Sequence, residues 1–410
     1  MKSLRSNIPL LVLISINQYG THLSSFLSFA SIGLDSNDLF SLSSALALKT
    51  LAIAFCSYFA SPFILKLNAR YSVIISQVAG VLSSILLWLG IEFRSIPWLI
   101  FASLLSGIAA VIFSNAMTLL LRRSVETDFE FKRSQASRGT CAACTFIITG
   151  ITWPWMFLTL GWQGILLLDI LTYCVALLLL QHTPTFKQGL WDAVGQITMT
   201  NHKSLTKDPA VGVIKQSINL FNKEGVIAYL LQILVIYAGV GIIPLIASSQ
   251  EFIRLGQPFN SEYRGFFWAV EAVSLFAANV SYNLMQGRSK VVPLIIAITS
   301  LSHILLYFGL LSSNVYLLLV LLFLGRFFME VQALLYRDQQ ILRAKTIHDQ
   351  VTRVSTIASF QSLAMALSPL ALFISFSMGH LLTFLIVVGG VQLCFWLLNK
   401  INYFLKMRPL

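Results

Sequence analysis

Five charged side chains fall inside long apolar stretches of the sequence, where a charge needs a specific reason to be present. They are Lys49, Asp169, Glu271, Arg326 and Glu330. A charge at the centre of a lipid bilayer costs about 2.5–3.5 kcal/mol even on insertion scales, so each group is expected to be paired, protonatable or functional. A buried carboxylate can exchange a proton, and an arginine can hold an anionic group through two parallel hydrogen bonds.

The spacing of these charges leaves their partners open. Arg326 and Glu330 are four residues apart, so on a helix they share a face and can form an ion pair. This pair either takes part in binding or only neutralises itself so that the helix can insert. Glu271 has no partner close in sequence, and it is either a protonatable carboxylate or the partner of Lys49.

The elements that hold these groups are membrane-spanning helices. The sequence is 57% hydrophobic and 11% charged, whereas a soluble protein of 410 residues would have about a quarter of its residues charged. A span needs roughly 17–25 apolar residues, and we count twelve such runs. Their approximate limits are 8–30, 40–65, 73–91, 97–121, 139–160, 162–181, 225–248, 263–285, 291–311, 315–336, 354–377 and 380–399.

The long gap after the sixth run divides the chain into two blocks of six spans. We predict an N-terminal bundle over 1–181, a cytoplasmic middle loop over 182–224 with a short amphipathic helix, and a C-terminal bundle over 225–410. Of the 28 Lys and Arg residues, only Arg94, Arg254 and Arg264 fall on one side, and Lys49 and Arg326 lie within spans. The positive-inside rule therefore places both termini in the cytoplasm.

Two basic segments 215 residues apart indicate that one six-span unit was duplicated in the same orientation. Arg122, Gln135, Arg138 and Pro154 recur in register as Arg337, Gln350, Arg353 and Pro369. Each segment follows the fourth apolar run of its block and leads into a run that contains the proline. Such internal repeats are typical of transporters. The arginines are either topology signals or parts of a cytoplasmic gate, and we favour the gate.

Several motifs resemble the major facilitator superfamily of secondary transporters, and the resemblance covers essentially the whole chain. Between the second and third runs, the segment 61–70 has Lys66 and Arg70 at the basic positions of the superfamily motif, and a reduced second copy contains Arg288. The segments 168–173 and 332–355 are similar to the branch that exports macrolides, other drugs and siderophores.

This resemblance implies an all-α integral membrane protein of twelve transmembrane helices in two pseudo-symmetric six-helix bundles. It also implies a central cavity lined by the first, fourth, seventh and tenth helices, and it adds Lys66, Arg70 and Arg288 to the candidate cytoplasmic gate. The polar side chains that we expect there are Gln18, His22, Asn115, Gln232, Tyr237, Arg326 and Glu330. The competing interpretation for each polar residue is that it joins neighbouring helices. Asp169, on the sixth helix, is expected to hydrogen-bond a neighbouring helix instead.

The sequence lacks the motifs of several other classes. It has no nucleotide-binding Gly-x-x-x-x-Gly-Lys-Ser/Thr loop, no His-Glu-x-x-His and no Gly-x-Ser-x-Gly. We therefore expect no enzyme activity, no cofactor or metal, and no nucleic-acid partner.

The expected function is movement of a small drug-like compound or siderophore across the cytoplasmic (inner) membrane by alternating access, as proton-coupled export. An importer of a similar solute, and a transporter-derived receptor or enzyme, are the alternatives.

Overall fold

The described part of the chain consists of helices that are apolar enough for a membrane. The computed structural model describes residues 2–35, 47–57, 69–123, 128–182, 261–285 and 315–343, and isolated positions 353, 359, 361–363, 365–366 and 394. Within these residues four helical segments have the length and hydropathy of a membrane span: Tyr71–Glu92, Ile96–Thr118, Arg133–Leu180 and Tyr316–Leu335. The protein is therefore an integral membrane protein, and the full count of twelve spans stays a prediction.

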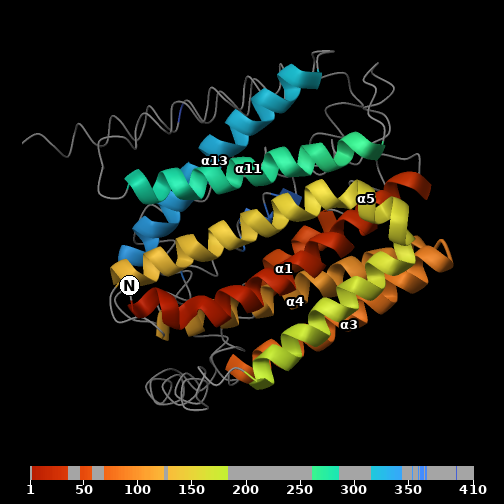
Figure 1. Ribbon diagram of the computed structural model, residues 1–410, viewed down its shortest axis with the longest axis horizontal. Coiled ribbons are helices and arrows are strands. Elements are labelled where there is room, and N and C mark those ends of the chain that lie inside the picture. The colour runs from red at the N-terminus through yellow and green to blue at the C-terminus, as the bar shows by residue number, and fades with distance from the viewer. Residues whose placement is uncertain are drawn as a thin grey trace, which may run out of the picture.

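The described helices pack side by side in an order that differs from their order in the chain. They are α1 (Lys2–Asp35), α3 (Ala69–Glu92), α4 (Ile96–Arg123), α5 (Asp128–His182), α11 (Ser261–Met285) and α13 (Val315–Arg343). The chief pairs are α3 with α4, α1 with α5, α5 with α11, and α11 with α13 (Figure 1). Segments far apart in sequence thus meet through α5, which contacts both α1 and α11.

Two turns with a positive φ angle join consecutive helices. After α3, the amides of Arg94 and Ser95 donate to the carbonyls of Ile91 and Gly90 at 3.2 and 2.9 Å, with Arg94 at φ 47°. This is a Schellman end of a helix, with arginine at the position usually taken by glycine. At Gly161 (φ 63°, ψ −179°) the backbone of α5 leaves the helical region, and the chain turns back there (Figure 1). The predicted runs 139–160 and 162–181 leave only Gly161 between them, and the tight turn that this spacing predicts is confirmed. The helix α5 continues past Pro154.

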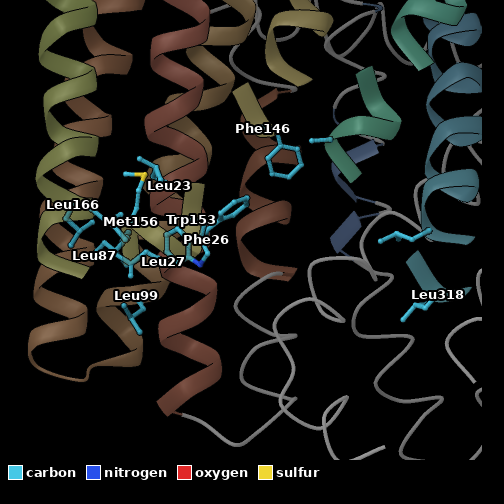
Figure 2. Close-up of a cluster of buried hydrophobic side chains, with 14 residues drawn as sticks. Leu23, Phe26, Leu27, Leu87, Leu99, Phe146, Trp153, Met156, Leu166 and Leu318 are labelled. Atoms are coloured by element: carbon cyan, nitrogen blue, oxygen red, sulfur yellow. The ribbon is translucent and has the colours of Figure 1, made fainter. Parts of the chain in front are cut away.

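The largest apolar cluster joins α5 to helices on both sides of it. It contains Phe26 of α1, Phe146 and Trp153 of α5, Ala272 of α11 and Leu318 of α13. Figure 2 shows most of the labelled members from α1, α3, α4 and α5 gathered together, whereas Phe146 lies apart from them, nearer to α11, and Leu318 lies at the other end of the cluster. Because these side chains are almost fully buried and contact one another, the group packs as one core.

Buried polar contacts tie α1 and α3 to the second part of α5. Ser84 donates a 2.6 Å hydrogen bond to Oδ2 of Asp169, which confirms the predicted role of Asp169 in joining helices. Asn17 donates to Gln77 at 2.9 Å. Gly20 lies where a Cβ would clash with Thr172 Oγ1, so the glycine permits the close approach of α1 to α5.

Candidate functional site

The most distinctive charged contact links α11 to α13. Nε of Arg326 lies 3.2 Å from Oε1 of Glu271, and the two side chains are only 10% and 7% exposed. The sequence left Glu330 open as a partner of Arg326 and Lys49 as a partner of Glu271, whereas the structure pairs Arg326 with Glu271. In the described part of the chain, the half-buried Glu330 forms no ion pair.

This ion pair leaves hydrogen-bonding capacity unused. Among the described residues, Oε2 of Glu271 has no hydrogen-bond partner, and Nε of Arg326 is also unsatisfied because its N–H does not point along the contact to Glu271. A buried ion pair is stable only when the remaining donors and acceptors are also satisfied. The site is therefore arranged to accept a further polar group, from water or from a ligand.

Four side-chain amides in the described part of the chain, one on each of four helices, also have a buried atom that lacks a hydrogen-bond partner. Each has one side-chain atom without a hydrogen-bond partner among the described residues: Gln18 Oε1 on α1, Asn115 Nδ2 on α4, Asn279 Oδ1 on α11 and Gln332 Oε1 on α13. Buried polar groups are normally satisfied, and exceptions often mark positions of water or ligand. Gln18 and Asn115 were predicted as cavity residues. Asn279 and Gln332 were not, although both are amides within apolar runs that also hold a charge.

His22 of α1 lies against an aromatic ring of α5. Its ring stacks on Phe146 of α5 with centroids 4.6 Å apart. Phe26 contacts Phe146 at 5.6 Å and meets Trp153 edge to face at 5.6 Å. Stacking and edge-to-face contacts are favourable arrangements for aromatic rings. The rings of His22 and Phe26 on α1 and of Phe146 and Trp153 on α5 thus form one aromatic group between the two helices.

Lys49 lies on the helix Ala47–Ser57 and contacts α1. Its Nζ donates to Ser25 Oγ at 3.2 Å. The alternative pairing with Glu271 is not found, because Glu271 contacts Arg326 instead.

Arg138 binds α4, which belongs to the same predicted bundle as α5. It donates to the carbonyl of Ser114 at 3.2 Å, to Ser114 Oγ at 2.7 Å and to Thr118 Oγ1 at 2.9 Å. These three bonds join α5 to α4 within the same predicted bundle. Arg353 is buried, with 6% exposure.

The remaining candidates lie outside the described residues or have side chains that do. Lys66, Gln232, Tyr237 and Arg288 belong to the first group, together with the middle loop and Pro369. Arg70 lies in α3, Arg122 in α4 and Arg337 in α13, with their side chains outside the description.

Comparison with solved structures places the fold among membrane transporters. A POT family transporter in complex with a thioalcohol-conjugated peptide aligns with a TM-score of 0.70 at 12% identity, over 97% of this chain and 96% of that chain. A bacterial homologue of the iron transporter ferroportin, in an outward-facing state, aligns with a TM-score of 0.67 at 14% identity, over 98% and 99%. The human organic anion transporter MFSD10 gives a TM-score of 0.66 at 12% identity, over 96% and 99%.

At the level of sequence, no family model matches the chain and no curated protein matches it. Identities of 10–14% among the aligned structures establish the fold alone. The expected all-α membrane fold is confirmed in its general type, and the chain shares the fold of these transporters.

Proposed function

We propose that the protein is a secondary active transporter in which Glu271 and Arg326 form the coupling pair. The proposal has the chain move a small organic molecule by alternating access of two halves around a site within the membrane. The observation that carries it is the buried but incompletely bonded contact between Arg326 and Glu271. A pair that served stability alone would be expected to have its remaining polar atoms satisfied.

In the proposed mechanism, the state of Glu271 controls the availability of Arg326. While Glu271 is ionised, its carboxylate neutralises the guanidinium 3.2 Å away. When a proton binds to Glu271 that attraction is lost, and an anionic group of the ligand can bind the guanidinium in its place. Release of the ligand restores the ion pair and returns the proton. In this scheme the proton and the anionic ligand bind together and leave together, so the pair couples the movement of one to the movement of the other.

The other candidate residues, which are amides and aromatic rings on α1, α4 and α5, favour an amphipathic ligand. Unsatisfied amides such as Gln18 and Asn115 offer hydrogen bonds to polar groups, and the rings of His22, Phe146 and Trp153 offer a flat apolar surface. Binding sites for small molecules combine such apolar walls with a few placed polar groups. A drug-like compound or a siderophore with an anionic group fits this chemistry.

We propose export from the cytoplasm across the cytoplasmic (inner) membrane, with both termini in the cytoplasm. The basis is the distribution of Lys and Arg in the sequence and the resemblance of segments 168–173 and 332–355 to exporters. The cytoplasmic arginines are proposed to form an inner gate. Among them, the structure describes the side chains of Arg138 and Arg353. Arg138 would act there by fixing α4 against α5. Substituting Arg138 should shift cysteine accessibility toward one membrane face, and unchanged accessibility on both faces would oppose the gate.

The substrate and direction can be found in one experiment. Small molecules inside cells and in the medium are compared without preselection, using cells that contain the protein, cells that lack it and cells with the Glu271→Gln variant. An exporter lowers the internal amount of its substrate and raises the external amount, and an importer does the reverse. The candidate compound is then tested by counterflow in proteoliposomes, where a receptor binds label without exchange and an enzyme changes the compound chemically. Either of those results would overturn the proposed function.

A further inference from the structure

Within a membrane span, the carboxylate of Glu330 on α13 has no positive partner in the described part of the chain. Glu330 lies in the apolar segment Tyr316–Leu335 and is half-buried. Arg326, one helical turn earlier, contacts Glu271 of α11 instead. Glu330 forms neither an ion pair nor a hydrogen bond with any described residue. A charge at bilayer depth is costly unless it is paired, so the presence of Glu330 needs a reason.

Glu330, Arg326 and Glu271 form one charged cluster. Residues four apart on a helix lie on the same face with their Cβ atoms about 5–6 Å apart, so Glu330 lies on the side of α13 that presents Arg326. Glu330 is also close enough to Glu271 for their negative charges to repel each other. One guanidinium and two carboxylates give the ionised cluster a net negative charge. The unbalanced charge is that of Glu330, because Arg326 already neutralises Glu271.

The same charge stays unbalanced in both states of the proposed transport cycle, on which this inference rests. In the empty site, the carboxylate of Glu271 neutralises Arg326. In the occupied site, Glu271 holds a proton and the anionic group of the ligand neutralises Arg326. Neither step brings a positive charge to Glu330. A ligand with only an anionic group would therefore bind next to a bare carboxylate and be repelled by it.

The partial exposure of Glu330 indicates what the ligand must supply. Because Glu330 is half-buried, its carboxylate is open to the adjacent space and can be hydrated there. A ligand that binds Arg326 one turn away displaces part of this hydration, and a carboxylate that loses water needs a cation or hydrogen-bond donors in exchange. A free metal cation would be repelled by the nearby guanidinium. We propose that the transported molecule is a zwitterion, whose anionic group binds Arg326 and whose protonated amine binds Glu330.

Small probes of known charge distinguish a zwitterion site from a simple anion site. The zwitterions are β-alanine, γ-aminobutyrate, δ-aminovalerate and ε-aminocaproate, and each is compared with the carboxylate and the amine of the same chain length. The unfolding temperature of the purified full-length protein in detergent, measured against probe concentration, gives each affinity. At the best-fitting length, the zwitterion should bind the wild type about tenfold or more tightly than the matched carboxylate, as expected for one added charge-assisted hydrogen bond.

Glu330→Gln removes the proposed partner of the amine. Because Glu330 has no ion-pair partner among the described residues, this variant should unfold near the wild-type temperature when no probe is present. It should bind the zwitterion and the matched carboxylate equally, and it should still bind the carboxylate through Arg326. Glu92→Gln, which removes the same charge from an exposed position, should keep the wild-type preference for the zwitterion.

Glu330→Asp keeps the charge and shortens the side chain by one methylene group. If the amine binds this carboxylate, the best-fitting zwitterion should become one methylene group longer. A residue that only stabilised the helix would leave the preferred chain length unchanged.

Equal binding of zwitterion and matched carboxylate by the wild type would overturn the zwitterion site and would leave Arg326 as the anion site of the proposed function. An unchanged preference for the zwitterion in Glu330→Gln would overturn it too, because the amine would then bind elsewhere. Failure of every probe to bind would also overturn it, whereas the transport function is decided separately by counterflow with the compound found in cells.

Discussion

Gly139 of α5 and Asn279 of α11 lie so close together that a side chain at position 139 would displace the amide of Asn279. A Cβ at position 139 would lie 2.5 Å from Oδ1 of Asn279. The contact joins residues from the two predicted halves of the chain, next to Arg138. Gly139→Ala should therefore push α5 and α11 apart and destabilise the protein by about 1–3 kcal/mol, the usual cost of overpacking.

A double-mutant cycle checks whether the contact with Asn279 is the cause. Asn279→Ala removes the atom that a new Cβ would strike, so the pair Gly139→Ala with Asn279→Ala should recover most of the lost unfolding temperature. Because the two residues touch, their effects should not add. Additive effects in the cycle would mean that Gly139 matters for another reason.

The Glu271–Arg326 pair makes a second prediction about stability. Arg326 is buried with a carboxylate as its neutralising partner, so Glu271→Gln should leave an uncompensated charge and cost about 3–5 kcal/mol. Replacing both residues by apolar ones of similar size, as in Glu271→Leu with Arg326→Met, should restore the unfolding temperature while abolishing transport. Recovery of transport in the double variant would show that the pair is only structural.

Asp169 should tolerate the loss of its charge but not of its oxygen. Its described hydrogen bond is accepted from Ser84 at 2.6 Å, and asparagine keeps an oxygen that can accept the same bond. Asp169→Asn should therefore transport and unfold like the wild type. Asp169→Leu should be destabilised by about 0.5–1.5 kcal/mol, because the bond that joins α3 to α5 is lost and Ser84 keeps only its bond to the carbonyl of Gly80 at 3.1 Å. Equal losses of transport in both variants at equal stability would give the charge a role in function.

The two turns with positive φ predict substitutions of opposite sign. Arg94 adopts φ 47° without being glycine, and Arg94→Gly should stabilise the protein by about 1 kcal/mol because it removes the left-handed strain. Gly161 has angles that only glycine adopts easily, and a Cβ there would meet no atom within 4 Å. Gly161→Ala should still cost about 1–3 kcal/mol. Unfolding temperatures that change in the same direction would contradict this interpretation.

The sequence predicted the elements better than the contacts between them. The apolar runs matched α3, α4 and α11 closely, because twenty or so apolar residues between polar loops leave few alternatives. The turn at Gly161 and the interhelical bond of Asp169 were also predicted correctly. The helices α1 and α5 extend further than their apolar runs, since helices continue into polar segments beyond the bilayer.

The partner of Arg326 was not predictable from the sequence alone. A spacing of four residues allows Arg326 to reach Glu330, but it gives no information about how α13 is rotated toward α11. That rotation is set by packing, and it directs Arg326 toward Glu271. The unsatisfied amides Asn279 and Gln332 were missed for a related reason, because their state depends on the absence of a partner on the neighbouring helices.

The most direct test of the coupling pair separates exchange from gradient-driven transport. Proteoliposomes containing wild type, Glu271→Gln or the exposed-residue control Glu92→Gln are loaded with the compound identified by the cell comparison. Counterflow, which needs no proton gradient, and transport driven by a pH gradient are then measured side by side. If Glu271 carries the proton, its glutamine variant should retain counterflow and lose the response to the pH gradient, while Glu92→Gln behaves as wild type. Transport by Glu271→Gln that follows the pH gradient at the wild-type rate would contradict the account.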